Sequence, residues 1–217
     1  MSKRKTTVSP KTQQMALTAI LATIAIVMAF TPIGYFGITG LFEIALILLP
    51  VAIGAVVLDW KAGLIMGAIF GITSYMIAAG IGMHPNALGT FMFQQNAFFT
   101  AIVCIVPRLI CGVVPAFIYK LISKKDKKGF IAIPTACVST AVLNTVLFLG
   151  AIWIFFGNPI QSEAAFGGFI VDKYGNFNFF TYFIAFAALN APVEIAACGV
   201  LGTAIAKPLL ILKEKMS

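Results

Sequence analysis

Six long apolar segments dominate this sequence and limit what it can fold into. A helix needs about 20 apolar residues to cross the hydrocarbon core of a bilayer. Hydrophobic residues make up 60% of the chain and charged residues only 10%, whereas a soluble domain carries about 25% charged residues. We therefore predict an all-α integral membrane protein, with residues 1–217 in a single membrane domain. Its six transmembrane helices are expected at about 14–31, 42–58, 61–80, 97–122, 131–156 and 180–206.

Positively charged residues predict how these helices are oriented. Residues 1–13 form a basic arm, and the apolar segment after it lacks a small-x-small cleavage site, so we expect a retained helix rather than a signal peptide. Cytoplasmic connections carry an excess of Lys and Arg. We therefore predict that both termini are cytoplasmic, which places 13 of the 15 basic residues on that side: Lys3, Arg4, Lys5, Lys11, Lys61, Lys120, Lys124, Lys125, Lys127, Lys128, Lys207, Lys213 and Lys215.

The connections on the opposite side are long and weakly charged. One of them, "GIGMHPNALGTFMFQQN", gathers polar side chains. Long loops rich in Gly, Asn and aromatic residues can fold over a binding pocket. We expect this loop to help cover a ligand through His84, Gln94, Gln95 and Asn96, the alternative being a plain, solvated connection.

A few polar residues fall within the apolar segments, where they are costly and usually face the inside of a helix bundle. Arg108, Asn144, Asn190 and Glu194 lie near the middle of their predicted helices. Asn190 and Glu194 are four residues apart and therefore share one helix face. Pro192 between them removes an amide and frees a backbone carbonyl. We predict that the four polar residues line a substrate-binding site.

Arg108, in "CIVPRLICGVV", admits two interpretations. It can be structural, forming an ion pair with Glu194 or hydrogen bonds to carbonyls freed near Pro107 and Pro115. It can also bind an anionic ligand, because a guanidinium fits a carboxylate in bidentate fashion. Either partner lowers the cost of burying the charge, so energetics alone do not separate the two.

The sequence lacks the motifs of several activities. It has no G-x-x-x-x-G-K-[ST] loop for ATP and no H-E-x-x-H or G-x-S-x-G motif. Glu194 and His84 are the only plausible acid–base groups and are expected at different depths, so we predict no enzyme. The four cysteines form no C-x-x-C pair and are expected to be buried filler without a metal. No basic stripe with interleaved aromatic residues indicates nucleic-acid binding.

Segments along nearly the whole chain resemble the substrate-binding S components of energy-coupling factor vitamin transporters. They are "ALTAILATIAIVMAF", "ALILLPVAIGAVVLDWKAGLIMGAIFGITS", "VPRLICGVVPAFIYKLI", "LNTVLFLG" and "LNAPVEIAACGVLGTAIAKPL". The resemblance implies a six-helix fold that holds its ligand near the outer surface. It also implies docking onto a transmembrane coupling subunit with two cytoplasmic ATPases, so that ATP is used by the partner subunits and this chain carries no cofactor.

The first helix carries a row of small residues that bears on this docking. The family commonly has an A-x-x-x-A surface there, which Ala25 and Ala29 fit strictly and Thr18 and Ala22 extend more loosely. Small residues let membrane helices approach closely. The row therefore predicts a docking face for the partner, the alternative being packing within the bundle.

Within the family, "LNTVLFLG" and the N-x-x-x-E of the sixth helix look most like the pantothenate-type members. Pantothenate has one carboxylate, one amide and two hydroxyl groups, which suit one arginine and several amides. We therefore expect the substrate-binding subunit of a pantothenate importer in a prokaryotic cell membrane. The alternatives are folate, riboflavin or hydroxymethylpyrimidine as the substrate, or a self-contained carrier or channel.

Overall fold

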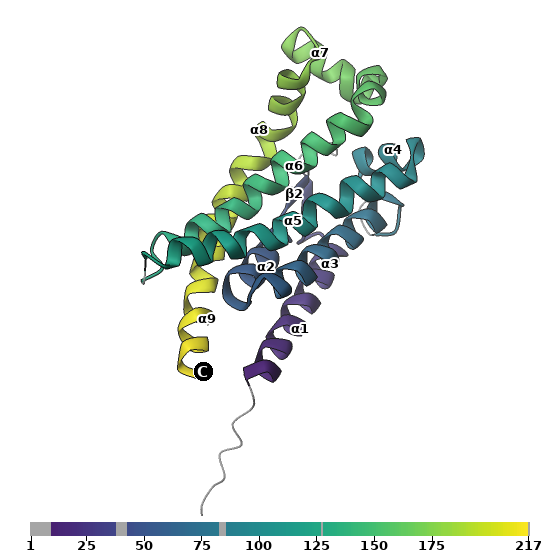
Figure 1. Cartoon of the computed structure of the whole chain (residues 1–217). Coiled ribbons are helices and arrows are strands. Elements are labelled where there is room, and N and C mark those ends of the chain that lie inside the picture. The colour runs from purple at the N-terminus through teal and green to yellow at the C-terminus, as the bar shows by residue number, and fades with distance from the viewer. Residues whose placement is uncertain (1–9, 38–42, 83–85, 127, 217) are drawn as a thin grey trace, which may run out of the picture.

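The computed structural model describes residues 10–37, 43–82, 86–126 and 128–216. Most of the predicted basic arm, together with His84 and Lys127, lies outside the described residues. Within them the chain is mainly helical (Figure 1). The helices are α1 (Pro10–Ala29), α2 (Leu48–Ile53), α3 (Trp60–Ala78), α4 (Ala87–Gln95), α5 (Ala97–Ser123), α6 (Ala132–Ser162), α7 (Phe169–Tyr174), α8 (Phe179–Ala197) and α9 (Thr203–Met216).

Three π-helical stretches and a small hairpin complete the described chain. The stretches are Gly54–Leu58 after α2, Ala164–Gly168 before α7 and Cys198–Gly202 between α8 and α9. Strands β1 (Tyr35–Gly37) and β2 (Glu43–Ala45) pair antiparallel, with Tyr35 opposite Ala45. The predicted helix at 42–58 is therefore wrong at its start, because its first residues form β2 and the helix begins only at Leu48.

Five described helices are long and apolar enough to cross a membrane, namely Thr12–Ala29, Trp60–Ala78, Ala97–Ser123, Ala132–Ser162 and Asn190–Lys213. The second predicted span corresponds to a shorter apolar helix, Leu48–Leu58. The fifth predicted helix continues to Ser162, and the sixth runs on through α9. An all-α type of multi-pass membrane protein is thus confirmed, whereas the number of six spans stays a prediction.

Glycines at every fourth position bring α3 directly against α5. A Cβ on Gly63 would overlap the carbonyl oxygen of Gly112, and a Cβ on Gly67 would overlap that of Arg108. Gly71 faces the backbone of Ile105 in the same way. Small residues allow such close backbone contact between membrane helices. This row fixes the part of α5 that carries Arg108.

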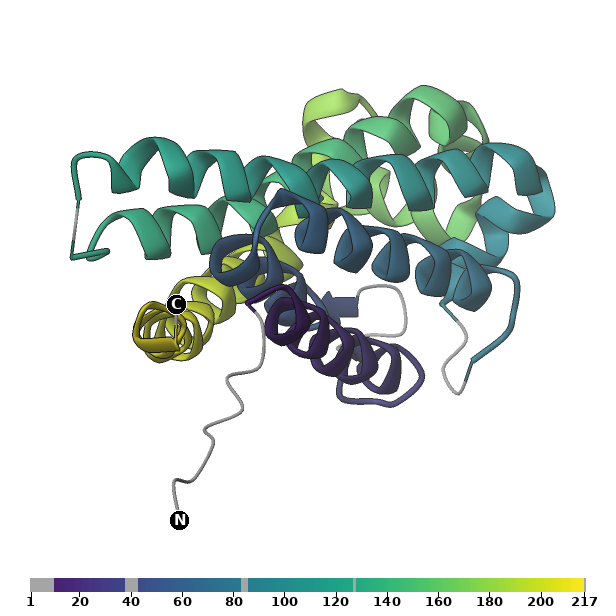
Figure 2. The same cartoon turned by 60° about the horizontal axis from the view of Figure 1, so that its bottom comes forward.

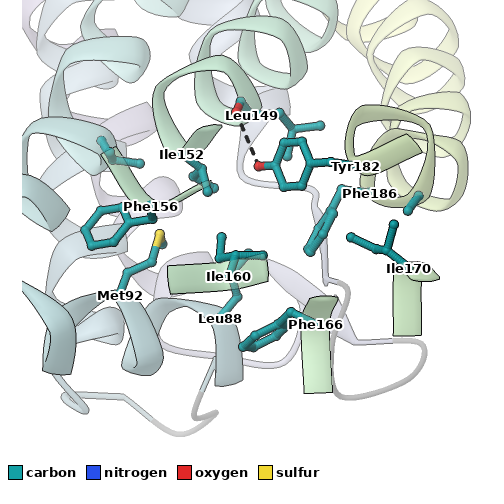
Figure 3. Close-up of a cluster of buried hydrophobic side chains, with 12 residues drawn as sticks. Leu88, Met92, Leu149, Ile152, Phe156, Ile160, Phe166, Ile170, Tyr182 and Phe186 are labelled. Carbon is teal, nitrogen blue, oxygen red and sulfur yellow. Dashed lines mark hydrogen bonds between the residues drawn. The ribbon is translucent and has the colours of Figure 1, made fainter. Parts of the chain in front are cut away.

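The other helices arrange themselves around this pair. α5 and α6 run side by side as a long antiparallel hairpin, whose tip projects beyond the neighbouring helices in Figure 2. α1 begins and α9 ends at the same end of the molecule, opposite α7 (Figure 1). At the end of the molecule where α7 lies, an aromatic cluster is enclosed by α4, α6 and α8. In this cluster the Tyr182 hydroxyl donates to the carbonyl oxygen of Leu149 at 3.2 Å (Figure 3).

Candidate functional site

A cavity lies where the β-hairpin and the start of α4 meet α3, α5, α6 and α8. Its volume is about 100 Å³, several times the roughly 10–15 Å³ that one water needs by the same kind of measure. Leu88, Met92, Leu149 and Phe186 belong both to its wall and to the cluster of Figure 3. The remaining lining residues are Tyr35, Glu43, Ala45, Phe70, Ser74, Ile77, Ala78, Asn86, Gly89, Cys104, Arg108, Asn144, Thr145, Phe148, Asn190 and Glu194.

Arg108 enters this cavity from α5 and is only 4% exposed. Its Nη1 donates to the carbonyl oxygen of Val103 at 2.9 Å. That carbonyl lies four residues before Pro107, which has no amide hydrogen to offer it. The guanidinium carbon also lies 3.7 Å from the ring centroid of Phe148 and 5.2 Å from that of Phe70. One helix carbonyl and two aromatic faces thus hold the charge in place.

Glu194 does not form the ion pair with Arg108 that was one of our two structural expectations. No ion pair joins the two side chains in the described chain. Instead, Oε1 of Glu194 accepts a hydrogen bond from the backbone N–H of Ala45 at 2.9 Å. The carboxylate is 4% exposed and so ties α8 to β2. The carboxylate of Glu194 lies beside the hairpin because the backbone N–H of Ala45 in β2 is available as its hydrogen-bond donor.

Four polar atoms of cavity-lining residues are buried without a hydrogen-bond partner in the described chain. They are the Tyr35 hydroxyl, Nε of Arg108 and Oδ1 of both Asn144 and Asn190. A buried polar group left unsatisfied costs about 1–3 kcal/mol. The residues that carry this donor, these two acceptors and this hydroxyl group therefore line one cavity, and a ligand with an acceptor at one end and donors at the other would complete them.

The predicted site residues divide into two groups. Arg108, Asn144, Asn190 and Glu194 all line the cavity, as their shared depth suggested. Gln94, Gln95 and Asn96 do not line it and are exposed. Asn96 instead caps α5, because its Oδ1 accepts from the backbone N–H of Phe99 at 3.1 Å. His84 is outside the described residues.

The structure adds a polar contact in the wall of the cavity, between the hairpin and the start of α4. The Asn86 side-chain amide donates to Oε2 of Glu43 at 2.7 Å, while its Oδ1 caps α4 by accepting from the Gly89 N–H at 2.6 Å. The hairpin is therefore held at two points, by Asn86 on α4 and by Glu194 on α8. Glu43 and Asn86 are visibly polar in the sequence. They are 43 positions apart, however, so no local pattern predicts that they pair. The sequence gives only a weak signal for the aromatic residues of the cavity wall, namely that Phe148 follows Asn144 by one helical turn.

The small residues of α1, for which a docking face was predicted, differ in how deeply the bundle buries them. Ala25 and Ala29 are buried within this chain, in a cluster with residues of α2 and α3. Ala22 packs against the same cluster, and the Thr18 hydroxyl donates to the Gln14 carbonyl at 2.8 Å. Ala25 and Ala29 therefore give α1 close packing in the bundle, which was the alternative interpretation, and docking onto a partner stays a prediction.

The four cysteines, Cys104, Cys111, Cys137 and Cys198, are buried free thiols. Among the described residues, no three His, Cys, Asp or Glu side chains come together as metal ligands would. Cys104 lines the cavity beside Arg108.

A bundle of apolar, membrane-length helices whose polar side chains converge on one cavity is the arrangement of a membrane protein that binds a small molecule. Comparison with known proteins gives its family. Residues 13–206 match the family described as the substrate-specific component of ECF (energy-coupling factor) transporters. Because the match covers most of the sequence, the chain belongs to this family, and the resemblance found in its helices is confirmed.

The chain is also similar to the pantothenic acid transporter PanT of Lactococcus lactis subsp. cremoris (strain MG1363). The two are 29% identical over 119 residues, which is 52% of this chain and 58% of PanT. The chain thus matches less than two thirds of the length of that relative.

Proposed function

We propose that this protein is the substrate-binding subunit of an energy-coupling factor importer and that its substrate is pantothenate. The observation that carries the proposal is the set of unpartnered polar atoms on cavity-lining residues, which includes one on Arg108 and two on asparagines. Similarity to PanT supports the same substrate. The protein acts by binding and handing on its ligand, and catalyses no reaction.

The chemistry of pantothenate suits these atoms. Its carboxylate would accept from Arg108, whose guanidinium is already oriented by Val103 and Phe148. Its hydroxyl and amide N–H groups would donate to the free oxygens of Asn144 and Asn190. The gem-dimethyl group would lie against the apolar wall.

The carboxylates around the cavity orient such a ligand further. Glu43 and Glu194 both line it, and their oxygens accept hydrogen bonds from hydroxyl groups. A ligand carboxylate is therefore favoured beside Arg108, whereas hydroxyl groups are favoured beside the two glutamates. A second anionic group, as in folate, would have no second buried cation among the described cavity residues.

The wider assembly follows from the family and the charge distribution. We place the protein in a prokaryotic cell membrane with six spans and both termini cytoplasmic, so that the cavity opens toward the outside. The partners would be a transmembrane coupling subunit and two ATPases, which would use the ATP. The small residues of α1 that remain partly exposed, Thr18 and Ala22, would contribute to the contact with the coupling subunit.

A thermal-shift titration of the detergent-solubilised protein tests the substrate. A ligand that binds only the folded state at 100 times its Kd stabilises that state by about 2.7 kcal/mol. Pantothenate should raise the melting temperature with saturation, whereas folate, riboflavin and hydroxymethylpyrimidine should not. A shift with another vitamin instead would overturn the choice of substrate, and pantothenate flux through liposomes holding this chain alone would overturn the importer subunit.

An amide variant tests the site itself. Asn144→Ala removes one of the unpartnered oxygens and should weaken pantothenate binding by roughly 3- to 10-fold, the effect of a hydrogen bond worth about 0.5–1.5 kcal/mol. Ser139→Ala is the matched control, because Ser139 lies on the same helix outside the cavity and bonds only to the Ala136 carbonyl. Equal affinities of the two variants would remove Asn144 from the site.

A further inference from the structure

The tip of the α5–α6 hairpin combines positive charge with exposed apolar surface. Lys120, Lys124, Lys125 and Lys128 are exposed there. Between and beside them, Leu121 is 68% exposed, and Phe130 and Ile131 are each 65% exposed. Three large apolar side chains in contact with water at a loop would be unfavourable. The same side chains are stable where a span ends, at the boundary between headgroups and acyl chains.

The acidic residue of the tip does not neutralise these lysines. Oδ2 of Asp126 accepts hydrogen bonds from the backbone N–H groups of Ile131 at 2.6 Å and Ala132 at 2.9 Å, and so caps the start of α6. No ion pair joins Asp126 to a lysine in the part of the chain that the structure describes. The ammonium groups of the tip therefore remain available to an external anion.

A residue far away in the sequence reaches the same place. The ammonium nitrogen of Lys207, on α9, lies 3.9 Å from the ring centroid of Phe130. A cation–π contact of this kind holds the ring and the charge together. It joins the tip to α9, so that basic groups from two separate elements surround one exposed aromatic ring.

We infer that this tip is a binding site for the headgroups of anionic phospholipids. The lysines contact the phosphate while their methylene stems run along the apolar surface, and Phe130, Ile131 and Leu121 enter the boundary of the acyl chains. Figure 2 shows the tip extending beyond the neighbouring helices, so that lipid can reach it. The bound lipid fixes the depth of the α5–α6 hairpin in the membrane. The inference does not depend on which vitamin is bound.

Native mass spectrometry of the full chain tests the site by counting retained phosphatidylglycerol molecules against phosphatidylcholine. A lysine near an anionic membrane surface contributes about 1 kcal/mol, so Lys124→Gln with Lys128→Gln should weaken phosphatidylglycerol binding roughly 30-fold. Lys61→Gln with Lys173→Gln removes the same charge from exposed positions elsewhere and should leave binding unchanged. Phe130→Ser should weaken retention without any change in charge.

Each contrary result overturns the inference. Equal loss in both double variants would mean that net charge alone attracts the lipid. Equal retention of phosphatidylcholine would mean that the headgroup charge is not recognised. If inorganic phosphate displaced the lipid at similar concentrations, the tip would be a phosphate site rather than a lipid site.

Discussion

The contact between α3 and α5 gives a sharp prediction, because the glycines of α3 that face α5 leave no room for a side chain larger than a hydrogen atom. Gly67→Ala places a methyl group where the carbonyl oxygen of Arg108 lies. The obstacle is backbone, so it cannot rotate away, and α3 must move from α5. Overpacking of this kind costs typically 1–3 kcal/mol, against which alanine returns up to about 1 kcal/mol of helix propensity. We expect a net loss of about 1–2 kcal/mol in the free energy of unfolding.

Gly150→Ala provides the matched control on α6. A Cβ at Gly150 meets no atom within 4 Å, so the same substitution should be neutral or stabilising by up to about 1 kcal/mol. Melting temperature in detergent and resistance to SDS-induced unfolding measure the difference. Because Gly67 faces Arg108, its variant should also bind pantothenate more weakly. Equal stability of the two variants would refute the close backbone contact.

Two further predictions concern buried and capping carboxylates. Glu194→Gln keeps an acceptor for the Ala45 N–H and removes a buried ionisable group, so the melting temperature should change little, whereas Glu194→Ala leaves that N–H without its partner and should lower it; equal values for the two variants would show that Glu194 does not hold β2. Hydrogen bonds from the backbone N–H groups of Ala132 and Ile131 lower the pKa of Asp126, so Asp126→Asn should destabilise the protein at pH 7. The pKa of Asp126 is lower in the folded state than in the unfolded state, so its ionised carboxylate stabilises the fold fully above the unfolded pKa of about 3.9. This stabilisation is lost as the pH falls through the folded-state pKa. A difference in melting temperature between the natural protein and Asp126→Asn that persists unchanged at pH 2 would contradict the role of Asp126 as the cap of α6.

The helical part of the fold was predictable because lipid exposure leaves a strong signal. Long apolar segments are required by the membrane itself, and α3, α5 and α6 begin within about one residue of the predicted positions. The hairpin was not predictable, because its strands are only three residues long and β2 is followed almost at once by the apolar helix α2, without a change in composition. The continuation of α6 to Ser162 was missed for a similar reason, since Pro159 near its end reads as a stop signal.

The site was predictable only where polarity was unexpected. Arg108, Asn144, Asn190 and Glu194 stand out in apolar helices, and the structure brings all four to one cavity. The partners of Arg108 were half foreseen: the carbonyl freed by Pro107 was an expectation, whereas the rings of Phe70 and Phe148 look like any lipid-facing phenylalanine. Loop residues gave the weakest guidance, because Asn96 is a helix cap and polarity in a loop does not distinguish a cap from a ligand contact.

The most direct test of the central claim compares pantothenate with pantothenol, in which a primary alcohol replaces the carboxylate. Isothermal titration would measure both ligands on the natural protein and on Arg108→Gln, with melting temperatures as the check on folding. A hydrogen bond to a charged group contributes about 1.5–3 kcal/mol, so the natural protein should prefer pantothenate by at least about 10-fold and the variant should have no preference. An unchanged preference in a folded variant would contradict the account, because Arg108 would then serve only the structure of α5.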